Sequence, residues 1–274
     1  CSAQTGPIFL AYRRREGIEE VVRAAMRGRP VYDFTAEDGV THRLWVIDGV
    51  EAVARIRREF AQVDAIYIAD GHHRCASAVR VSQQRRAAHP AHTGAEEFNY
   101  FLSVLFPDDQ LMIMDYNRVV RSLNGHSEAE FLDRLRQVCD VRLVGEEPCR
   151  PRRKGEIGMY LKDAWYLLTI GAERYGEDPV ESLDVTILQR DILEPILGIK
   201  DPKVDERIDF VGGIRGLEEL VRRVHTDAAA AFAMYPTDIH ELFAVSDAGK
   251  LMPPKSTWFE PKLRSGILIH TIEE

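Results

Sequence analysis

Residues 65–80 read AIYIADGHHRCASAVR, and the two halves of this stretch predict different backbone structures. The first half, 65–70, is apolar and β-branched as far as Asp70, which is typical of a short buried strand. The second half, 72–80, continues with small and polar residues, which favour a helix. Gly71 lies between them and allows a close approach to the backbone. The stretch therefore predicts a strand that turns directly into a helix at residues 70–74.

This turn has the groups that an anionic ligand needs. The backbone N–H groups at the start of a helix lack partners within the helix, and the helix dipole favours negative charge at that point. His72, His73 and Arg74 add side-chain donors at the same place. We predict that Gly71, His73 and Arg74 bind phosphate, and that Asp70 and His72 take part in catalysis.

The residues of this turn also fit simpler roles. Asp70 can act as the N-cap of the helix, which is a common position for aspartate. The two histidines can be structural, although three cationic side chains in succession are rarely packed into a core. Adjacent histidines also suggest a metal, but neighbouring helical side chains point about 100° apart, which is poor geometry for shared ligation. Asp70 remains a candidate ligand for Mg²⁺.

A second polar segment lies near the C-terminus, where residues 252–266 read MPPKSTWFEPKLRSG. Its prolines hold the backbone rigid without a helix, and its cations and hydroxyls suit a phosphate or a carboxylate. The alternative is a solvated tail, which Trp258 and Phe259 oppose because aromatic side chains favour burial. The predicted anion-binding residues of this segment are Lys255, Ser256, Thr257, Lys262 and Arg264.

Weaker site candidates come from two further places. Asp184 is polar near the start of a helix expected over 178–197, where it can equally lie at the surface. Asp209 lies in a short strand expected over 208–211, and Gly212 and Gly213 follow it. Two glycines between a strand and a helix indicate either a ligand loop or a tight turn.

The motifs resemble those of a known family. IADGHHRCASA at 68–78 and the run at 252–266 resemble the two hallmarks of the family called domain of unknown function 1015, and SLDVTIL at 182–188 and IDFVGG at 208–213 resemble it too. More remotely, DGHHR at 70–74 resembles the phosphate-binding turn of ParB proteins, sulfiredoxin and free-serine kinases. This second resemblance implies a nucleotide such as ATP or ADP as co-substrate, and phosphoryl transfer implies Mg²⁺.

Composition limits the choice of partners. The chain has 274 residues, 45% hydrophobic and 29% charged, with a net charge of −8, so a broad nucleic-acid surface is not expected. A basic cluster at 150–154 is expected to form an exposed hairpin or linker rather than a nucleic-acid contact, because no aromatic residues that could stack on bases are interleaved with it. No run of roughly 18 apolar residues predicts a membrane span. Cys1, Cys75, Cys139 and Cys149 form no disulfide pattern, which favours reduced thiols and a cytoplasmic location.

The first residue is unusual because the chain begins with Cys1 rather than with Met. An N-terminal nucleophile is one reason for such a start. Truncation is the other, since members of the resembled family have a long region before this point. The resemblance implies that an N-terminal segment is missing, and with it the general base.

Helical and strand patterns alternate along the chain, with hairpins among them, which predicts an α/β or α+β fold of mixed sheets and flanking helices. A ParB/sulfiredoxin-like element is expected around the DGHHR turn. We expect a first domain over 1–120, with the phosphate-binding turn, and a second over 121–274 that ends in the basic, proline-rich segment.

Three classes of function remain at this stage. The first is a nucleotide-dependent phosphotransferase acting on a small hydroxyl-bearing metabolite such as serine. The second is a ParB-like, nucleotide-dependent DNA-binding protein, which the acidic composition and the lack of a clear helix-turn-helix oppose. The third is a non-catalytic sensor of a phosphorylated metabolite, or a partner subunit.

Overall fold

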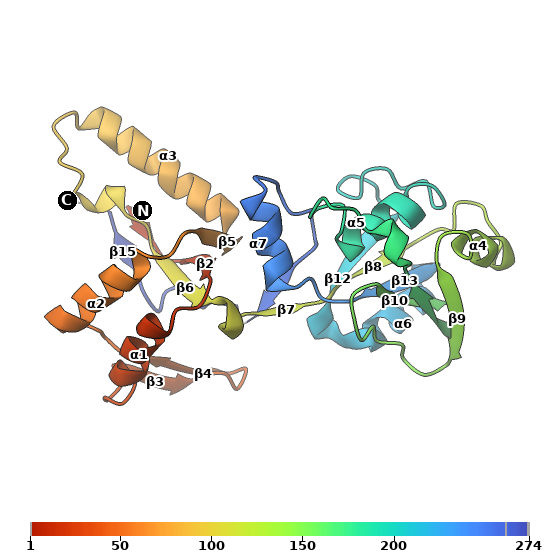
Figure 1. The fold of residues 1–274 in the computed structure, drawn as a ribbon, viewed down its shortest axis with the longest axis horizontal. Coiled ribbons are helices and arrows are strands. Elements are labelled where there is room, and N and C mark those ends of the chain that lie inside the picture. The colour runs from red at the N-terminus through yellow and green to blue at the C-terminus, as the bar shows by residue number, and fades with distance from the viewer. Residues whose placement is uncertain (1, 261, 273–274) are drawn as a thin grey trace. The chain divides into compact units, whose positions relative to one another are not determined.

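A computed structural model describes residues 2–260 and 262–272, so the question raised by Cys1 lies outside the described residues. Internal contacts divide the chain into two compact units, shown in Figure 1. Unit 1 holds the described residues up to 111 and those from 262 onward. Unit 2 holds the described residues from 112 to 260. The predicted mixed α/β fold is confirmed. The domain division expected at residue 120 stays a prediction.

Unit 1 is built on a three-stranded sheet in the order β5-β2-β6. The central strand β2 (Ile8–Tyr12) is buried along its whole length because it has a partner on each edge and helices nearby. It pairs antiparallel with β5 (Ile66–Asp70) and parallel with β6 (Ser103–Pro107). Helices α1 (Glu16–Ala25) and α2 (Val50–Phe60) pack on each other beside this sheet.

Unit 1 also contains a strand pair that joins its first and last described segments, a hairpin, a long helix and two short turns. Strand β1 (Ala3–Gln4) pairs antiparallel with β15 (His270–Thr271), so the last described segment returns to the first. The remaining elements are the hairpin β3 (Tyr32–Thr35) and β4 (Thr41–Leu44), helix α3 (His72–Ala88), and the 3₁₀ turns η1 (Glu97–Asn99) and η2 (Asp108–Gln110).

Unit 2 is built on a six-stranded sheet in the order β12-β8-β13-β10-β11-β9, with every pairing antiparallel. Its strands are β8 (Tyr116–Val120), β9 (Asp140–Gly145), β10 (Glu156–Leu161), β11 (Ala164–Thr169), β12 (Ile208–Gly212) and β13 (Ala230–Met234). A separate short pair joins β7 (Met112–Met114) to β14 (Trp258–Glu260).

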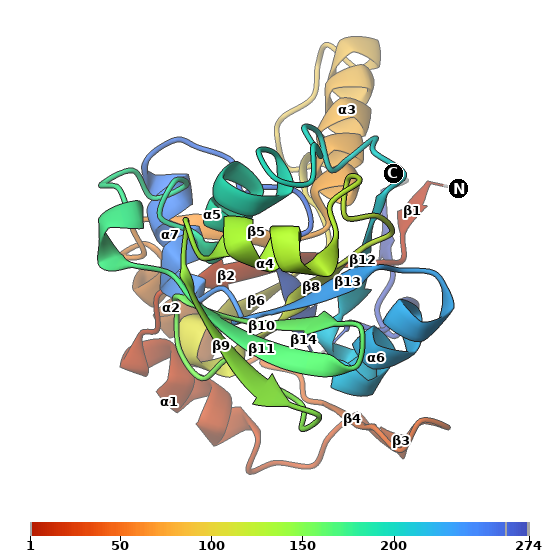
Figure 2. The same cartoon turned by 90° about the vertical axis from the view of Figure 1, so that its right-hand side faces the viewer.

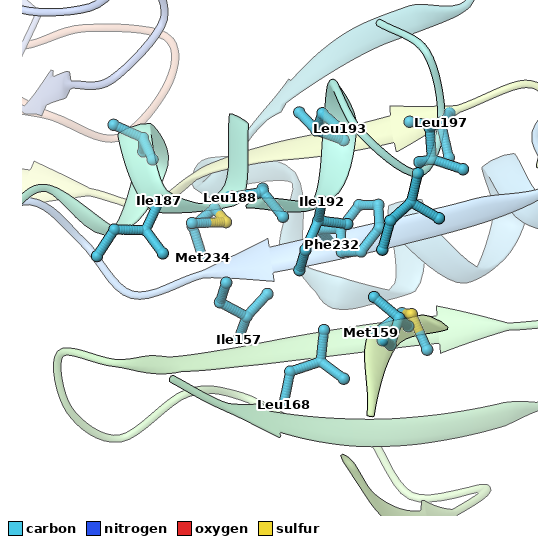
Figure 3. Packing of buried hydrophobic residues seen from close by; sticks show 14 of the residues in the cluster. Ile157, Met159, Leu168, Ile187, Leu188, Ile192, Leu193, Leu197, Phe232 and Met234 are labelled. Atoms are coloured by element: carbon cyan, nitrogen blue, oxygen red, sulfur yellow. The ribbon is translucent and has the colours of Figure 1, made fainter. Parts of the chain in front are cut away.

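Helices cover both faces of this sheet, as Figure 2 shows. The larger core lies under α4 (Glu128–Leu135), α5 (Asp184–Leu188) and the π-helical segment η4 (Gln189–Leu193), and Figure 3 shows its packed side chains around Phe232. The opposite face packs against α6 (Gly216–Thr226). Helix α7 (Ile239–Asp247) and the 3₁₀ turns η3 (Ala172–Arg174) and η5 (Gly213–Arg215) complete the unit. In β10 and β13, successive apolar side chains point to opposite faces of the sheet, so each strand contributes to both cores.

The helix expected over 178–197 is wrong in its extent. Asp178 does accept a hydrogen bond from the Val180 N–H at 2.9 Å, but the regular helix α5 begins only at Asp184. After α5 the helix widens into a π-helical turn, in which the N–H of Glu194 bonds to the carbonyl of Gln189, five residues earlier, at 3.0 Å. Pro195 explains the widening, since its ring has no N–H and clashes with the carbonyl four residues before it.

Candidate functional site

The predicted strand, turn and helix at 65–80 are confirmed. Strand β5 ends at Asp70, Gly71 adopts the left-handed conformation with φ 93° and ψ 28°, and α3 begins at His72. The strand is anchored by the burial of Tyr67 and Ala69 and by pairing with β2, so the position of the turn is set by the sheet. A residue with a Cβ would be strained at this φ, which explains the glycine.

The first turn of α3 has no side-chain cap. The earliest helical hydrogen bond runs from the N–H of Cys75 to the carbonyl of Gly71 at 2.9 Å. Among the described residues, none provides an acceptor for the N–H groups of His72, His73 and Arg74. Asp70 does not act as the N-cap, because its Oδ1 accepts a hydrogen bond from the N–H of Gly71 at 2.9 Å instead. The donors at this helix start therefore face solvent or a ligand.

The side chain of Arg74 folds back over the turn. A Cβ placed on Gly71 would lie 2.8 Å from Nη2 and 2.9 Å from Nε of Arg74, so the guanidinium occupies the space that glycine leaves. The ion pair between Arg74 Nη2 and Asp70 Oδ2 is long at 3.8 Å, and both side chains are about half exposed. A pair of this kind contributes little to stability, so the guanidinium can turn to an anion at small cost.

A cavity of about 500 Å³ adjoins this turn within unit 1. His73, Arg74 and Ser77 of α3 line one side, and the loop at Thr5 and Gly6 lines another. His72 is not a lining residue, since consecutive helical side chains point in different directions. The cavity thus places one of the two predicted histidines beside Arg74, and the catalytic role predicted for His72 stays a prediction.

The C-terminal hallmark at 252–266 is divided between the units. Lys262 and Arg264 belong to unit 1, where Arg264 pairs with Asp38 of the β3–β4 hairpin. The next residue, Ser265, lines the cavity, and the N–H of Gly266 bonds to the carbonyl of Thr5 at 2.8 Å. The two hallmark motifs therefore meet in unit 1 through Arg74 and Ser265.

Lys255, Ser256 and Thr257 belong to unit 2. The Nζ of Lys255 lies 5.6 Å from the centre of the Tyr116 ring, a cation–π contact. Ser256 is buried, and its Oγ donates to the carbonyl of Pro253 at 2.7 Å. The carbonyl of Ser256 accepts a hydrogen bond from Thr237 Oγ1 at 3.0 Å. These contacts give Lys255 and Ser256 a structural role in unit 2, and their anion-binding role stays a prediction.

Asp184 is buried and forms two strong hydrogen bonds. Its carboxylate accepts from the N–H of Gly155 at 2.9 Å and from the Tyr175 hydroxyl at 2.7 Å. Burial raises the pKa of Asp184, although both hydrogen bonds oppose that rise. The residue ties the segment after η3 and the segment before β10 to the start of α5, and its role in a ligand site stays a prediction.

Asp209, Gly212 and Gly213 also have structural partners. Asp209 pairs with Arg223 at 2.8 Å. Burial tends to raise its pKa, but hydrogen bonds from the Phe210 N–H and from Arg223 outweigh burial and lower it. A Cβ on Gly212 would come within 2.6 Å of the Trp258 ring, and one on Gly213 within 2.3 Å of Asp115. The two glycines are needed for close packing, and a ligand role for these three residues stays a prediction.

Metal binding and the basic cluster at 150–154 are the remaining expectations about charge. Within the residues that the structure describes, no group of three or more His, Cys, Asp or Glu side chains could hold a metal ion, and Mg²⁺ binding by Asp70 stays a prediction. In the basic cluster, Arg150 pairs with Asp115, Arg153 with Glu156 and Lys154 with Glu241. Internal carboxylates therefore offset most of this cluster.

The sequence did not single out Thr5, Gly6, Ser77 or Ser265 as site residues. A Cβ on Gly6 would lie 3.5 Å from Ser265 Oγ and 3.6 Å from Arg74 Nη1, so both side chains approach this glycine. The signals that could have found them are the Gly6-Pro7 pair before a buried strand and the Ser265-Gly266 pair that closes the C-terminal hallmark. No helix in the described part of the chain is long and apolar enough to cross a membrane.

Fold and site define a mixed α/β protein of two units with an uncapped helix start beside a cavity. The family model described as "Protein of unknown function (DUF1015)" matches residues 1–186, and the chain belongs to this family. No curated protein gives a significant match.

Solved structures similar to this chain include a free serine kinase mutant in complex with ADP, at 14% identity and a TM-score of 0.38, covering 92% of this chain and 83% of that one. The free serine kinase in complex with AMP is similar at 14% identity and a TM-score of 0.35, with the same coverage. A conserved hypothetical protein from Pyrococcus furiosus is similar at 14% identity and a TM-score of 0.35, covering 92% of this chain and 86% of that one.

Proposed function

We propose that unit 1 binds the phosphate groups of a nucleotide at the start of α3 and transfers a phosphoryl group to a small hydroxyl-bearing metabolite. The observation that carries this proposal is the uncapped first turn after Gly71, bordered by Arg74 and by a cavity. The resemblance of DGHHR to the phosphate-binding turn of ParB proteins, sulfiredoxin and free-serine kinases supports it.

Phosphate recognition would combine backbone and side-chain donors. The N–H groups of His72, His73 and Arg74 are available, and the positive end of the α3 dipole lies at the same place. The guanidinium of Arg74 lies over Gly71 and offers paired donors that match two phosphate oxygens. Glycine at the turn leaves room for this guanidinium, because a Cβ there would lie 2.8 Å from its Nη2.

The cavity would accommodate the rest of the ligand. Its volume of about 500 Å³ lies within the usual range of small-molecule pockets. Gln4, Thr5, Ser77 and Ser265 offer hydroxyl and amide groups on its walls. Hydroxyl-bearing ligands are recognised through such groups.

Phosphoryl transfer needs more than a phosphate-binding turn. The nucleophile must be held in line with the phosphoryl group, and the charge that develops on the transferring oxygens must be neutralised. Asp70 is the carboxylate at the turn, and it would orient the incoming hydroxyl or hold Mg²⁺ together with phosphate oxygens. His72 or His73 would carry the proton, since an imidazole can both accept and donate one. Lys262 and Arg264 belong to the same unit and would add positive charge.

Removal of the Arg74 guanidinium is expected to weaken nucleotide binding. Arg74→Ala should lower the affinity for ADP by roughly 10- to 150-fold, the equivalent of losing a charge-assisted hydrogen bond worth about 1.5–3 kcal/mol. Isothermal titration calorimetry on the full chain measures this change. Arg80→Ala is the matched control, because Arg80 is an exposed arginine of the same helix and does not line the cavity. If Arg74→Ala and Arg80→Ala bind ADP with equal affinity, Arg74 does not contribute to nucleotide binding.

Asp70→Asn is expected to separate binding from transfer. The amide keeps the shape of the side chain but loses the charge, so ADP affinity should change by less than about threefold. Turnover should fall by about 100-fold or more, the usual contribution of a positioned acid–base group. The assay follows phosphoserine formation from ATP or ADP and L-serine by phosphorus NMR, with and without Mg²⁺. If the unmodified chain binds nucleotide but forms no phosphorylated product, the result would favour the sensor function.

A further inference from the structure

A second cavity, of about 220 Å³, lies wholly within unit 2. Its walls are mainly apolar and include Val185, Leu193, Ile208 and Phe210. Five polar side chains interrupt these walls: the exposed Asp201 and Lys203, and Arg118 of β8, Thr186 of α5 and Gln189 of η4. Apolar pockets with a few placed polar groups are typical of small-molecule sites.

Arg118 is a buried cation without an acidic partner. Only 4% of the residue is exposed, its guanidinium lies 5.5 Å from the centre of the Phe210 ring, and it forms no ion pair with a carboxylate of the described residues. Its Nη2 donates to the carbonyl of Lys255 at 3.1 Å, and its Nη1 donates to the carbonyl of Tyr116. Burial lowers the pKa of Arg118 to about 10, so the side chain stays charged at neutral pH. Because a buried charge normally has a counter-charge, this guanidinium suits an anionic ligand.

Thr186 and Gln189 leave hydrogen-bonding atoms unused. Thr186 Oγ1 and Gln189 Oε1 are both buried and have no hydrogen-bond partner among the described residues. The orientation of the Gln189 amide is set by its Nε2, which donates to the carbonyl of Ile199 at 2.7 Å. Its Oε1 is therefore an acceptor in need of a donor. An unsatisfied buried polar group costs about 1–3 kcal/mol, and both atoms have almost no accessible surface in this structure, so a ligand would satisfy them only after the side chains rotate toward the cavity.

The backbone at Gln189 is unusual as well. This residue begins the π-helical segment η4, in which the N–H of Glu194 bonds to the carbonyl of Gln189. Single π turns inside helices occur frequently at functional sites because they shift side chains out of the α-helical register. The segment supplies Gln189 and Leu193 to the cavity wall.

We propose that this cavity binds a small carboxylic acid with an apolar body and an O–H or N–H donor. The carboxylate would pair with Arg118, and rotation of the Thr186 and Gln189 side chains would bring the Thr186 hydroxyl to the carboxylate and Gln189 Oε1 to the donor. At the rim, Lys203 and Asp201 carry opposite charges, so Arg118 accounts for the net positive charge. The volume of about 220 Å³ suits the buried part of a small molecule.

Carboxylate binding in unit 2 does not depend on phosphate binding, since every residue that lines this cavity belongs to unit 2 and the phosphate site belongs to unit 1. The test uses calorimetric titration of the full chain with leucic acid, which carries a carboxylate, a hydroxyl and a branched apolar body. Saturable binding is expected, and the primary amide of leucic acid should bind at least about 10-fold more weakly because it lacks the charge. Absence of binding at millimolar concentrations, or equal affinity for acid and amide, would overturn the proposal.

Thr186→Val provides a variant that keeps the fold. Because the hydroxyl has no partner among the described residues, its removal should leave the thermal midpoint unchanged or raise it. The affinity for leucic acid should nevertheless fall by about 3- to 10-fold. Thr226→Val is the control, since Thr226 Oγ1 already bonds to the carbonyl of Arg222 at 2.8 Å and lies outside the cavity. Leucic acid binding that is unaffected by Thr186→Val would also contradict the assignment.

Discussion

Gly71→Ala is expected to abolish most nucleotide binding and to destabilise unit 1. The left-handed backbone at φ 93° costs about 1–2 kcal/mol for a residue with a Cβ. The new methyl group would also lie 2.8 Å from Nη2 of Arg74, so the guanidinium must leave its place over the turn. We expect ADP affinity to fall by up to the roughly 10- to 150-fold that we assign to Arg74, because the strained turn and the displaced guanidinium no longer present their donors together.

Gly94→Ala is the matched control for this experiment. Gly94 lies in the same unit at φ 94°, and a Cβ there meets nothing within 4 Å. Both variants should therefore lose about the same stability from backbone strain, while only Gly71→Ala loses ADP binding. Thermal unfolding and calorimetric titration measure the two effects separately. A Gly71→Ala protein that binds ADP as tightly as Gly94→Ala would show that the turn is only a helix start.

Phe232→Ala is expected to lower the free energy of unfolding of unit 2 by about 3–5 kcal/mol, the usual cost of truncating a fully buried aromatic residue. Phe232 is 0% exposed on β13, and Figure 3 shows its ring among Ile192, Met159 and their neighbours. Neighbouring strands hold it from both sides, so the site cannot easily collapse to fill the void.

Hydrogen exchange of the β10 and β13 amides measures this change in unit 2 directly. Leu143→Ala is the control, because Leu143 lies on the same sheet but is 60% exposed, and surface changes usually stay within about 0.5 kcal/mol. Protection of β13 amides that falls equally in both variants would contradict the core position of Phe232. Amides of β2 in unit 1 report whether the two units unfold separately.

Much of the site could be predicted because its signals are local. A β-branched run, one glycine and a helix-forming run specify the strand and the helix by propensity and periodicity, and the orphan donors of the turn follow from helix geometry. Lys255 and Asp184 show the limit of local patterns. A cation beside hydroxyls, or an acid at the start of a helix, can either bind a ligand or hold the fold together, and the sequence looks the same in both cases. Only the contacts in the folded chain distinguish a binding role from a structural role.

The sequence by itself determined the mixed α/β class and the strand–Gly71–helix turn with its donors. Only the tertiary structure decided that Ser265, from the far end of the chain, lies beside Arg74, and that Arg118, Thr186 and Gln189 surround one cavity. The physical reason is the range of the interactions. Propensity and capping act within a few residues, whereas the pairing of β1 with β15 and of β8 with β12 brings together segments that no local pattern relates.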